Sequence, residues 1–237
     1  MKIKAVLFDL DGTLLPMDQD VFIKHYFMAL AEKMAPKGYE PNRFLGTITS
    51  GTKAMLSNNG EMTNEDAFWG AFTAVYGDDA RDMEEATFEE FYKNEYCNLK
   101  KFCGTNPQTR NVLDLCHQKG LRTVLATNPV FPPVATIERI SWNGMTSQDF
   151  EFITTYENCN YCKPKNGYYT DIAKQLGLLP EECLMVGNDV IDDMTAGDIG
   201  MKVFLLTDCL INGVESDLER YPSGSFDELL SFIENLE

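Results

Sequence analysis

The sequence contains few histidines and comparatively few basic residues. Only two histidines, His25 and His117, occur in 237 residues, so few side chains are available for a histidine-based mechanism. Lysine and arginine together number 20 against 37 aspartates and glutamates, which gives a formal net charge of −17. A surface this acidic repels nucleic-acid backbones and anionic membranes. We therefore expect no nucleic acid and no membrane among the partners of this chain.

Long apolar runs are also missing. No stretch approaches the roughly 20 residues needed to cross a bilayer, and a strand-like run stands near residue 1 in place of a signal-peptide pattern. The seven cysteines are odd in number and scattered, which suits a reducing compartment, and we expect a cytoplasmic protein. Cys159 and Cys162 form a C-x-x-C without a second pair or a nearby histidine. We interpret them as loop thiols that bind no zinc and do no redox chemistry.

Apolar runs of strand length alternate with helical patterns in most of the chain. This alternation predicts a doubly wound parallel sheet of α/β class. The expected strands are Ile3–Phe8, Leu121–Ala126, Phe150–Thr154, Cys183–Val186 and Met201–Leu206. The expected helices are Gln108–Lys119, Pro132–Ser141, Tyr168–Leu176, the short Asp193–Gly197 and Phe226–Leu236.

Strand patterns disappear between the first expected strand and about residue 103. Helical spacing of apolar residues recurs there in Val21–Lys33, Asn64–Tyr76 and Phe88–Tyr96. We expect two domains, a core formed by residues 1–16 and 104–237 and an all-helical insert formed by 17–103. The expected core of the insert is mostly aromatic and consists of Phe22, Phe27, Leu30, Phe68, Trp69, Phe72, Val75, Phe91 and Tyr92.

Two carboxylates, Asp9 and Asp11, follow the first expected strand at a spacing of two residues. The carboxyl ends of strands are where parallel sheets place their ligand sites. Two anions this close are unfavourable unless a cation joins them, and Mg²⁺ is the usual cation for oxygen ligands. Gly12 permits a turn whose backbone N–H groups converge on an anion. Together these features predict a site for a metal and a phosphate group.

The motif Phe8-Asp9-Leu10-Asp11-Gly12-Thr13-Leu14 resembles the first motif of the haloacid dehalogenase-like (HAD) hydrolase superfamily. The resemblance implies a Rossmann-like core with a helical cap inserted after this motif. It implies that Asp9 is a nucleophile that forms an aspartyl-phosphate and that Asp11 is the general acid/base, with its backbone carbonyl on Mg²⁺. Haloacid dehalogenases lack an aspartate at the second position, so Asp11 favours phosphoryl transfer over dehalogenation.

Candidates for the second and third motifs of the family follow in the expected order. Thr127 and Asn128 come after the second expected strand, where a hydroxyl and an amide can bind phosphoryl oxygens. Lys163, followed by Pro164, fits the catalytic lysine that offsets negative charge on the nucleophile and the phosphate. Lys165 is a neighbouring rival for that role.

The fourth motif departs from the family pattern. After the strand Cys183–Val186 the sequence reads Gly187-Asn188-Asp189-Val190-Ile191-Asp192-Asp193. One alignment pairs Asp189 with Asp193 and keeps two carboxylates, whereas the other pairs Asn188 with Asp193 and makes the first ligand neutral. We expect Asp189 to bind Mg²⁺, because a hard dication prefers charged oxygen, and Asp193 to act behind it or through water. Asp192 is a third candidate.

These residues predict an enzyme, a Mg²⁺-dependent phosphatase for a small phosphorylated metabolite. The loops around 46–51, 58–60 and 15–19 are candidates for substrate contacts. A phosphomutase would use the same site with another acceptor, and a phosphonate hydrolase would need a Schiff-base lysine from the insert, where Lys24, Lys33, Lys37 and Lys53 are available. A non-catalytic phosphoryl- or metal-binding protein is the remaining alternative. The sequence leaves the substrate and the oligomeric state open.

Overall fold

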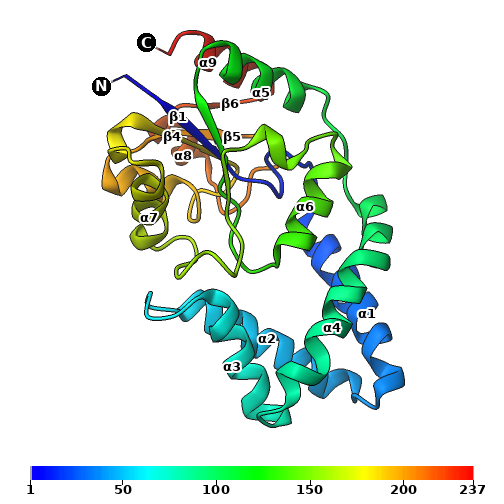
Figure 1. Cartoon of the computed structure of the whole chain (residues 1–237). Helices are drawn as coiled ribbons and strands as arrows, with labels where there is room; N and C mark the ends of the chain where they lie inside the picture. Colours follow the sequence, from blue (N-terminus) through cyan, green and yellow to red (C-terminus); the bar gives the residue numbers. More distant parts are fainter. Residues whose placement is uncertain (1, 237) are drawn as a thin grey trace.

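A computed structural model describes residues 2–236 and shows a parallel sheet flanked by helices (Figure 1). The six strands lie in the order β3-β2-β1-β4-β5-β6, and every neighbouring pair is parallel. This confirms the Rossmann-like α/β class expected from the alternation of strands and helices. The strands are β1 Ala5–Phe8, β2 Arg122–Leu125, β3 Phe152–Ile153, β4 Cys183–Gly187, β5 Lys202–Leu206 and β6 Ser223–Gly224.

Helices occupy both the core and the segment between β1 and β2. In that segment lie α1 Gln19–Met34, α2 Pro41–Ser57, α3 Asn64–Tyr76 and α4 Ala80–Asn94. Around the sheet lie α5 Gln108–Gln118, α6 Pro133–Trp142, α7 Asn166–Leu176, α8 Glu215–Arg220 and α9 Phe226–Glu234.

The central strand β1 is buried on both of its faces. Val6 and Phe8 belong to an apolar cluster that includes side chains of α5 and α9, whereas Ala5 and Leu7 belong to a second cluster with side chains of α7. Side chains alternate between the two faces of a strand, so a strand covered on both faces reads as a continuous apolar run. This explains why the sequence around β1 is apolar without interruption.

The helices between β1 and β2 pack on one another through aromatic rings. Phe44, Phe68, Phe72 and Phe88 form edge-to-face, tilted and stacked contacts with centroid separations of 5.8–6.4 Å. Such pairs add to the free energy gained by burying the rings. Most of the residues expected in this core are buried, but Val75 was wrongly included, because it is 38% exposed near the end of α3.

Helix α2 corrects one expectation about loops. Residues 46–51 were expected to form a loop that contacts substrate, but they lie inside α2. The helix begins after Glu40, whose carboxylate accepts hydrogen bonds from the backbone N–H groups of Asn42 and Arg43. Gly51 is needed for packing, because a Cβ there would lie 2.5 Å from the ring of Phe68. Gly51 therefore allows the close approach of α2 and α3 and does not mark a loop.

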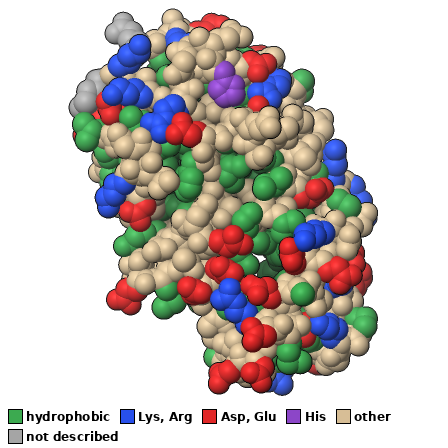
Figure 2. Space-filling model, viewed as in Figure 1, with side chains coloured by type: hydrophobic (Ala, Val, Ile, Leu, Met, Phe, Trp, Pro, Cys, Tyr) green, Lys and Arg blue, Asp and Glu red, His purple; other side chains and the backbone are tan. Residues whose placement is uncertain are grey.

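Smaller differences concern short elements. The expected helix after β4 is a 3-10 turn over Met194–Ile199, the edge strand β3 has only two residues, and β6 was not expected. In the described part of the chain, no helix is both long and apolar enough to span a membrane. Figure 2 shows acidic side chains gathered mainly over the lower part of the molecule, which the segment between β1 and β2 forms.

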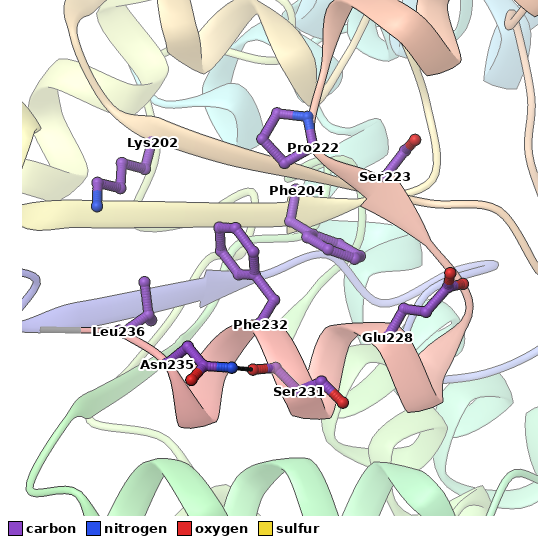
Figure 3. A pocket seen from close by; sticks show the side chains of 9 residues that line it. All are labelled: Lys202, Phe204, Pro222, Ser223, Glu228, Ser231, Phe232, Asn235 and Leu236. Carbon is purple, nitrogen blue, oxygen red and sulfur yellow. Dashed lines mark hydrogen bonds between the residues drawn. The ribbon is translucent and has the colours of Figure 1, made fainter.

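A groove of about 710 Å³ lies along α9 and β5 (Figure 3). Its walls include Lys202 at the first position of β5 and Asn235 beyond the end of α9. The candidate catalytic residues follow the carboxyl ends of the strands, so this groove lies toward the opposite edge of the sheet. It shares no residue with the site described below.

Candidate active site

The candidate catalytic residues converge at the carboxyl edge of the sheet. Strand β1 lies between β2 and β4, with Phe8 in register with Leu125 on one side and Val186 on the other. Asp9 therefore follows the central strand, while Thr127 and Asn188 follow its two neighbours. Parallel strands that end together bring residues far apart in sequence to one place.

Lys163 connects the first motif to the fourth. Its Nζ atom lies 2.7 Å from Oδ1 of Asp9 and 2.6 Å from Oδ1 of Asp193. The side chains of Lys163 and Asp193 are each only 1% exposed. Burial alone would lower the pKa of Lys163, but the carboxylates of Asp193 and Asp9 raise it above its ordinary value. The lysine is therefore held as a cation between two buried carboxylates.

Asp11 faces a different cation, Arg139 of α6. A guanidinium Nη1 donates to Oδ2 of Asp11, and the arginine is completely buried. Burial raises the pKa of Asp11 and Asp9 adds to this effect, while the charge of Arg139 opposes it. The backbone carbonyl of Asp11 accepts a hydrogen bond from Nε2 of Gln19 at 2.9 Å.

The turn after Asp11 packs tightly against the loop that follows β4. Gly12 has a φ of +86°, and a Cβ on it would lie 2.4 Å from Nδ2 of Asn188. The Thr13 hydroxyl donates to Oδ1 of Asn188 at 2.9 Å, and Nδ2 of Asn188 donates to the carbonyl of Cys209. Both polar atoms of this amide thus already have partners. Asn188 therefore fixes the geometry of this loop against the turn after Asp11.

Asp189 and Asp193 lie next to each other, but their carboxylates have different partners. The backbone N–H of Asp189 donates to Oδ2 of Asp193 at 3.0 Å. Oδ1 of Asp189 accepts from the N–H groups of Ile191 and Asp192, and Oδ2 accepts from Nδ2 of Asn212 at 2.8 Å. The third acidic candidate, Asp192, accepts from Asn128 of the second motif at 3.1 Å.

Thr127 and Lys165 are the two remaining candidates, and they have different hydrogen-bond partners. Thr127 is buried, and its carbonyl accepts hydrogen bonds from the hydroxyls of Thr154 and Tyr168, which hold the second-motif loop in place. Lys165 points away from Asp9, since its Nζ donates to the carbonyls of Leu56 and Asn58 at 2.6 Å each. The lysine at the centre of the site is therefore Lys163.

The C-x-x-C pair lies outside the network. Cys159 and Cys162 are free thiols, and both are buried. Burial raises the pKa of each thiol to about 12. Because the thiolate is the form that binds metals and attacks disulfides, this environment disfavours reactivity.

The donor chemistry of the site fits a divalent cation, although no cluster of three or more His, Cys, Asp or Glu side chains is arranged as a cage among the described residues. Among the described residues, Asp9, Asp11 and Asp193 form ion pairs with two cations, Lys163 and Arg139, and Asp189 adds a fourth carboxylate without an ion pair. Burial raises the pKa of Asp193, while the charge of Lys163 lowers it and that of Asp9 raises it further. Surplus negative charge on hard oxygen donors is what Mg²⁺ neutralises.

Sequence reasoning missed Arg139 and Asn212 near the site, and it included Gln19 only as the end of the candidate substrate segment 15–19. Arg139 binds Asp11, Asn212 binds Asp189 and Gln19 binds the carbonyl of Asp11. One pattern in the sequence points to Arg139, which has Thr136 and Ala135 three and four residues before it and therefore shares their buried helix face. A charge on the apolar face of a helix is unusual unless it has a buried partner. Asn212 lies in a loop and Gln19 is the first residue of α1, and neither carries a comparable pattern.

Comparisons with known proteins identify the family of this chain and structures of similar fold. The family model for haloacid dehalogenase-like hydrolases matches residues 3–199. No curated protein matches the sequence. Three solved structures illustrate the likeness in fold. A predicted phosphoglycolate phosphatase from Haemophilus somnus 129PT has a TM-score of 0.60 and 18% identity, with 98% of each chain covered.

The second structure, a HAD phosphatase from Thermococcus onnurineus, has a TM-score of 0.60 and 21% identity, with 99% of each chain covered. The third, an L-2-haloacid dehalogenase, has a TM-score of 0.57 and 17% identity, with 99% of this chain and 100% of that chain covered. Identities this low show the fold alone. Because the family model covers most of the sequence, however, this chain belongs to the haloacid dehalogenase-like hydrolase family of enzymes.

Proposed function

We propose that this chain is a Mg²⁺-dependent phosphatase that hydrolyses a small phosphorylated metabolite through an aspartyl-phosphate on Asp9. One observation carries the proposal: Asp9 is bound to the buried Lys163, while a second carboxylate, Asp11, stands two residues further on. The pair gives the site a nucleophile and a separate acid/base. A dehalogenase resembling the family pattern would have no use for Asp11.

The first half of the proposed reaction transfers the phosphoryl group to the protein. A carboxylate oxygen of Asp9 attacks phosphorus, the bond to the leaving oxygen breaks, and Asp11 donates the proton that this oxygen needs. Lys163 offsets the negative charge on the nucleophile and on the phosphoryl oxygens. In this proposal, the Thr127 hydroxyl and the Asn128 amide on the adjacent loop bind those oxygens.

The second half returns Asp9 to its starting state. Water attacks phosphorus, Asp11 takes the proton of the water, and the bond between phosphorus and Asp9 breaks to release phosphate. The residues that would hold Mg²⁺ are Asp9, the backbone carbonyl of Asp11 and Asp189, with Asp193 behind them. When bound, the cation screens the repulsion between the attacking carboxylate and the phosphoryl oxygens.

We further propose that residues 17–103 act as a cap over this site and that residues 1–16 and 104–237 form the catalytic core. Hydrogen bonds between the two parts support this division. Asn64 at the start of α3 donates to the carbonyls of Pro129 and Tyr161, which lie in the second- and third-motif loops. A cap in this position would exclude bulk water from the phosphoryl group.

The four lysines considered for phosphonate hydrolysis do not favour that alternative. Lys33 pairs with Glu90 and Glu95, and Lys37 pairs with Glu84, so these amines are bound within the insert. Lys24 and Lys53 are exposed. A Schiff-base mechanism would need one of these amines beside the phosphoryl site.

The test is phosphate release from p-nitrophenyl phosphate with Mg²⁺, followed by a panel of sugar phosphates, nucleotides and phosphonates. We expect turnover by the parent protein and a loss of at least ~10³-fold in Asp9→Asn, because the nucleophile is removed. The exposed Asp20→Asn in α1 is the matched control and should keep full activity. A parent protein that hydrolyses no ester, or an Asp9→Asn variant that keeps its rate, would refute the proposal.

A further inference from the structure

Arg139 is the most unusually placed charged residue near the proposed site. Its guanidinium is completely buried, yet among the described residues only Nη1 has a hydrogen-bond partner, which is Oδ2 of Asp11. Nε and Nη2 of the arginine have none, and neither does Oδ1 of Asp11, although all three atoms are buried. Two guanidinium nitrogens and one carboxyl oxygen of this ion pair are therefore without a hydrogen bond.

Stability does not account for this arginine. Burying a guanidinium carries a large desolvation free energy. Its attraction to one carboxylate offsets this free energy only when the remaining N–H groups also have hydrogen-bond partners. Its neighbours on the buried face of α6, Ala135 and Ile140, are apolar, and an apolar side chain would suit this face better. Residues that break such local rules without a gain in stability are characteristic of functional sites.

The guanidinium is held in one place by its surroundings. Its Cζ atom lies 4.4 Å from the centroid of the Phe131 ring, a cation–π distance. Phe131 stands four residues after Thr127, in the same loop that would bind the phosphoryl oxygens. A buried, stacked arginine offers a planar group with little freedom to move. It can therefore hold a carboxylate at a fixed orientation beside this loop.

We propose that Arg139 is a positioning residue for Asp11 and selects which oxygen of that carboxyl group transfers the proton. By holding Oδ2, Arg139 leaves Oδ1 as the carboxyl oxygen without a hydrogen-bond partner among the described residues, and in this proposal Oδ1 carries the proton. This inference deepens the proposed phosphatase reaction and rests on it. In the first half-reaction the proton on Oδ1 moves to the leaving oxygen as its bond to phosphorus breaks. The carboxylate that remains on Asp11 is then paired with the guanidinium.

The nature of the leaving group separates this role from a structural one. An alkoxide needs a proton to leave, whereas p-nitrophenolate leaves readily without one. A residue that orients the general acid therefore matters for an alkyl phosphate and matters little for p-nitrophenyl phosphate. The ratio kcat/KM is the right measure, because it does not include the later hydrolysis of the aspartyl-phosphate. General acid catalysis contributes about 10²–10⁴-fold, which sets the size of the effect.

The experiment measures kcat/KM of the parent protein, Arg139→Gln and Arg139→Lys with glycerol phosphate and with p-nitrophenyl phosphate. We expect Arg139→Gln to lose about 10²-fold or more with glycerol phosphate and less than about 10-fold with p-nitrophenyl phosphate. Arg139→Lys should recover part of the loss, because it keeps one charged donor. The control is Arg110→Gln, an arginine of α5 that pairs with Asp114 and Asp149 and should show no dependence on the leaving group.

Equal losses with both esters, or no loss with either, would overturn the inference. If Arg139→Gln does not fold, the same comparison with Arg139→Lys decides. Failure of the proposed function looks different, since the parent protein would then hydrolyse neither ester. Activity of the parent protein together with leaving-group independence in the variants would reject only the role of Arg139.

Discussion

At the scale of single residues, the site depends on the match between buried charges. The Nζ atom of Lys163 lies 2.7 Å from Asp9 and 2.6 Å from Asp193. All three residues are buried, so bulk water does not replace these ion pairs in the folded protein. Removing one member of a buried ion pair leaves the other uncompensated, which costs more than the pair itself contributes.

Replacing Lys163 with methionine should therefore lower the free energy of unfolding by about 3–5 kcal/mol and abolish phosphate release. Urea unfolding measures the first effect. The double variant Lys163→Met/Asp193→Asn should recover part of the stability but none of the activity, because it removes one stranded carboxylate without restoring the cation. A Lys163→Met protein as stable as the parent would show that the ion pairs seen here do not form.

The residues that could be predicted from sequence share one property, a short local motif. Asp9, Asp11 and Gly12 occur together, and Lys163 stands next to a proline, so each carries its own signature. Arg139 and Asn64 have partners 128 and 65 residues away. The neighbouring sequence does not indicate those partners, because only the fold brings them together.

At the scale of elements, contacts between loops join the helical insert to the core. Lys165 donates to two carbonyls at the end of α2, and Asn64 donates to Pro129 and Tyr161. Gly60 lies against Tyr161, where a Cβ would come within 2.2 Å of the ring. The end of α2, the start of α3 and the third-motif loop therefore form one continuous contact.

Asn64→Ala should weaken this contact. Asn64 is completely buried, so the carbonyls that it leaves without a donor should reduce the free energy of unfolding by about 1–3 kcal/mol, and looser docking should raise KM. Chemical denaturation and steady-state kinetics with p-nitrophenyl phosphate measure the two effects. Asn59→Ala, at an exposed position in the loop that precedes α3, should change stability by less than about 0.5 kcal/mol. Indistinguishable variants would argue that the contact contributes nothing.

Element types were predictable wherever the apolar pattern was long. Strands β1, β2, β4 and β5 and helix α7 fall within one or two residues of the expected ranges. Helix α2 was missed because its glycines and threonines suggest a loop. The helix starts after Glu40 and has Pro41 at its first position, and Gly51 is needed for packing against α3, which the sequence does not reveal.

At the scale of the whole molecule, sheet order determines what the separate motifs can do. The carboxyl ends of β1, β2 and β4 are neighbours, so four acids and two cations meet at one edge. The alternation of strands and helices predicted a parallel sheet, but the strand order was implied only by the family resemblance. Periodicity contains no information about which strands are adjacent.

The surplus of acids predicts that Mg²⁺ stabilises the folded protein. A ligand that binds only the folded state at 100 times its Kd adds about 2.7 kcal/mol, so Tm should rise with added Mg²⁺. Asp189→Asn should greatly reduce that rise, whereas the exposed Asp198→Asn should retain it. Differential scanning calorimetry without substrate makes this measurement independent of activity. An identical rise in Asp189→Asn would place the cation elsewhere.

The most direct test of the account is to find the covalent intermediate. The protein is mixed with p-nitrophenyl phosphate and Mg²⁺, quenched with acid within milliseconds, digested and mapped by mass spectrometry. We predict a phosphoryl group on the peptide that contains Asp9, rising and falling during turnover and absent from Asp9→Asn. Turnover without protein-bound phosphate at any time, or phosphate on another residue, would contradict the account.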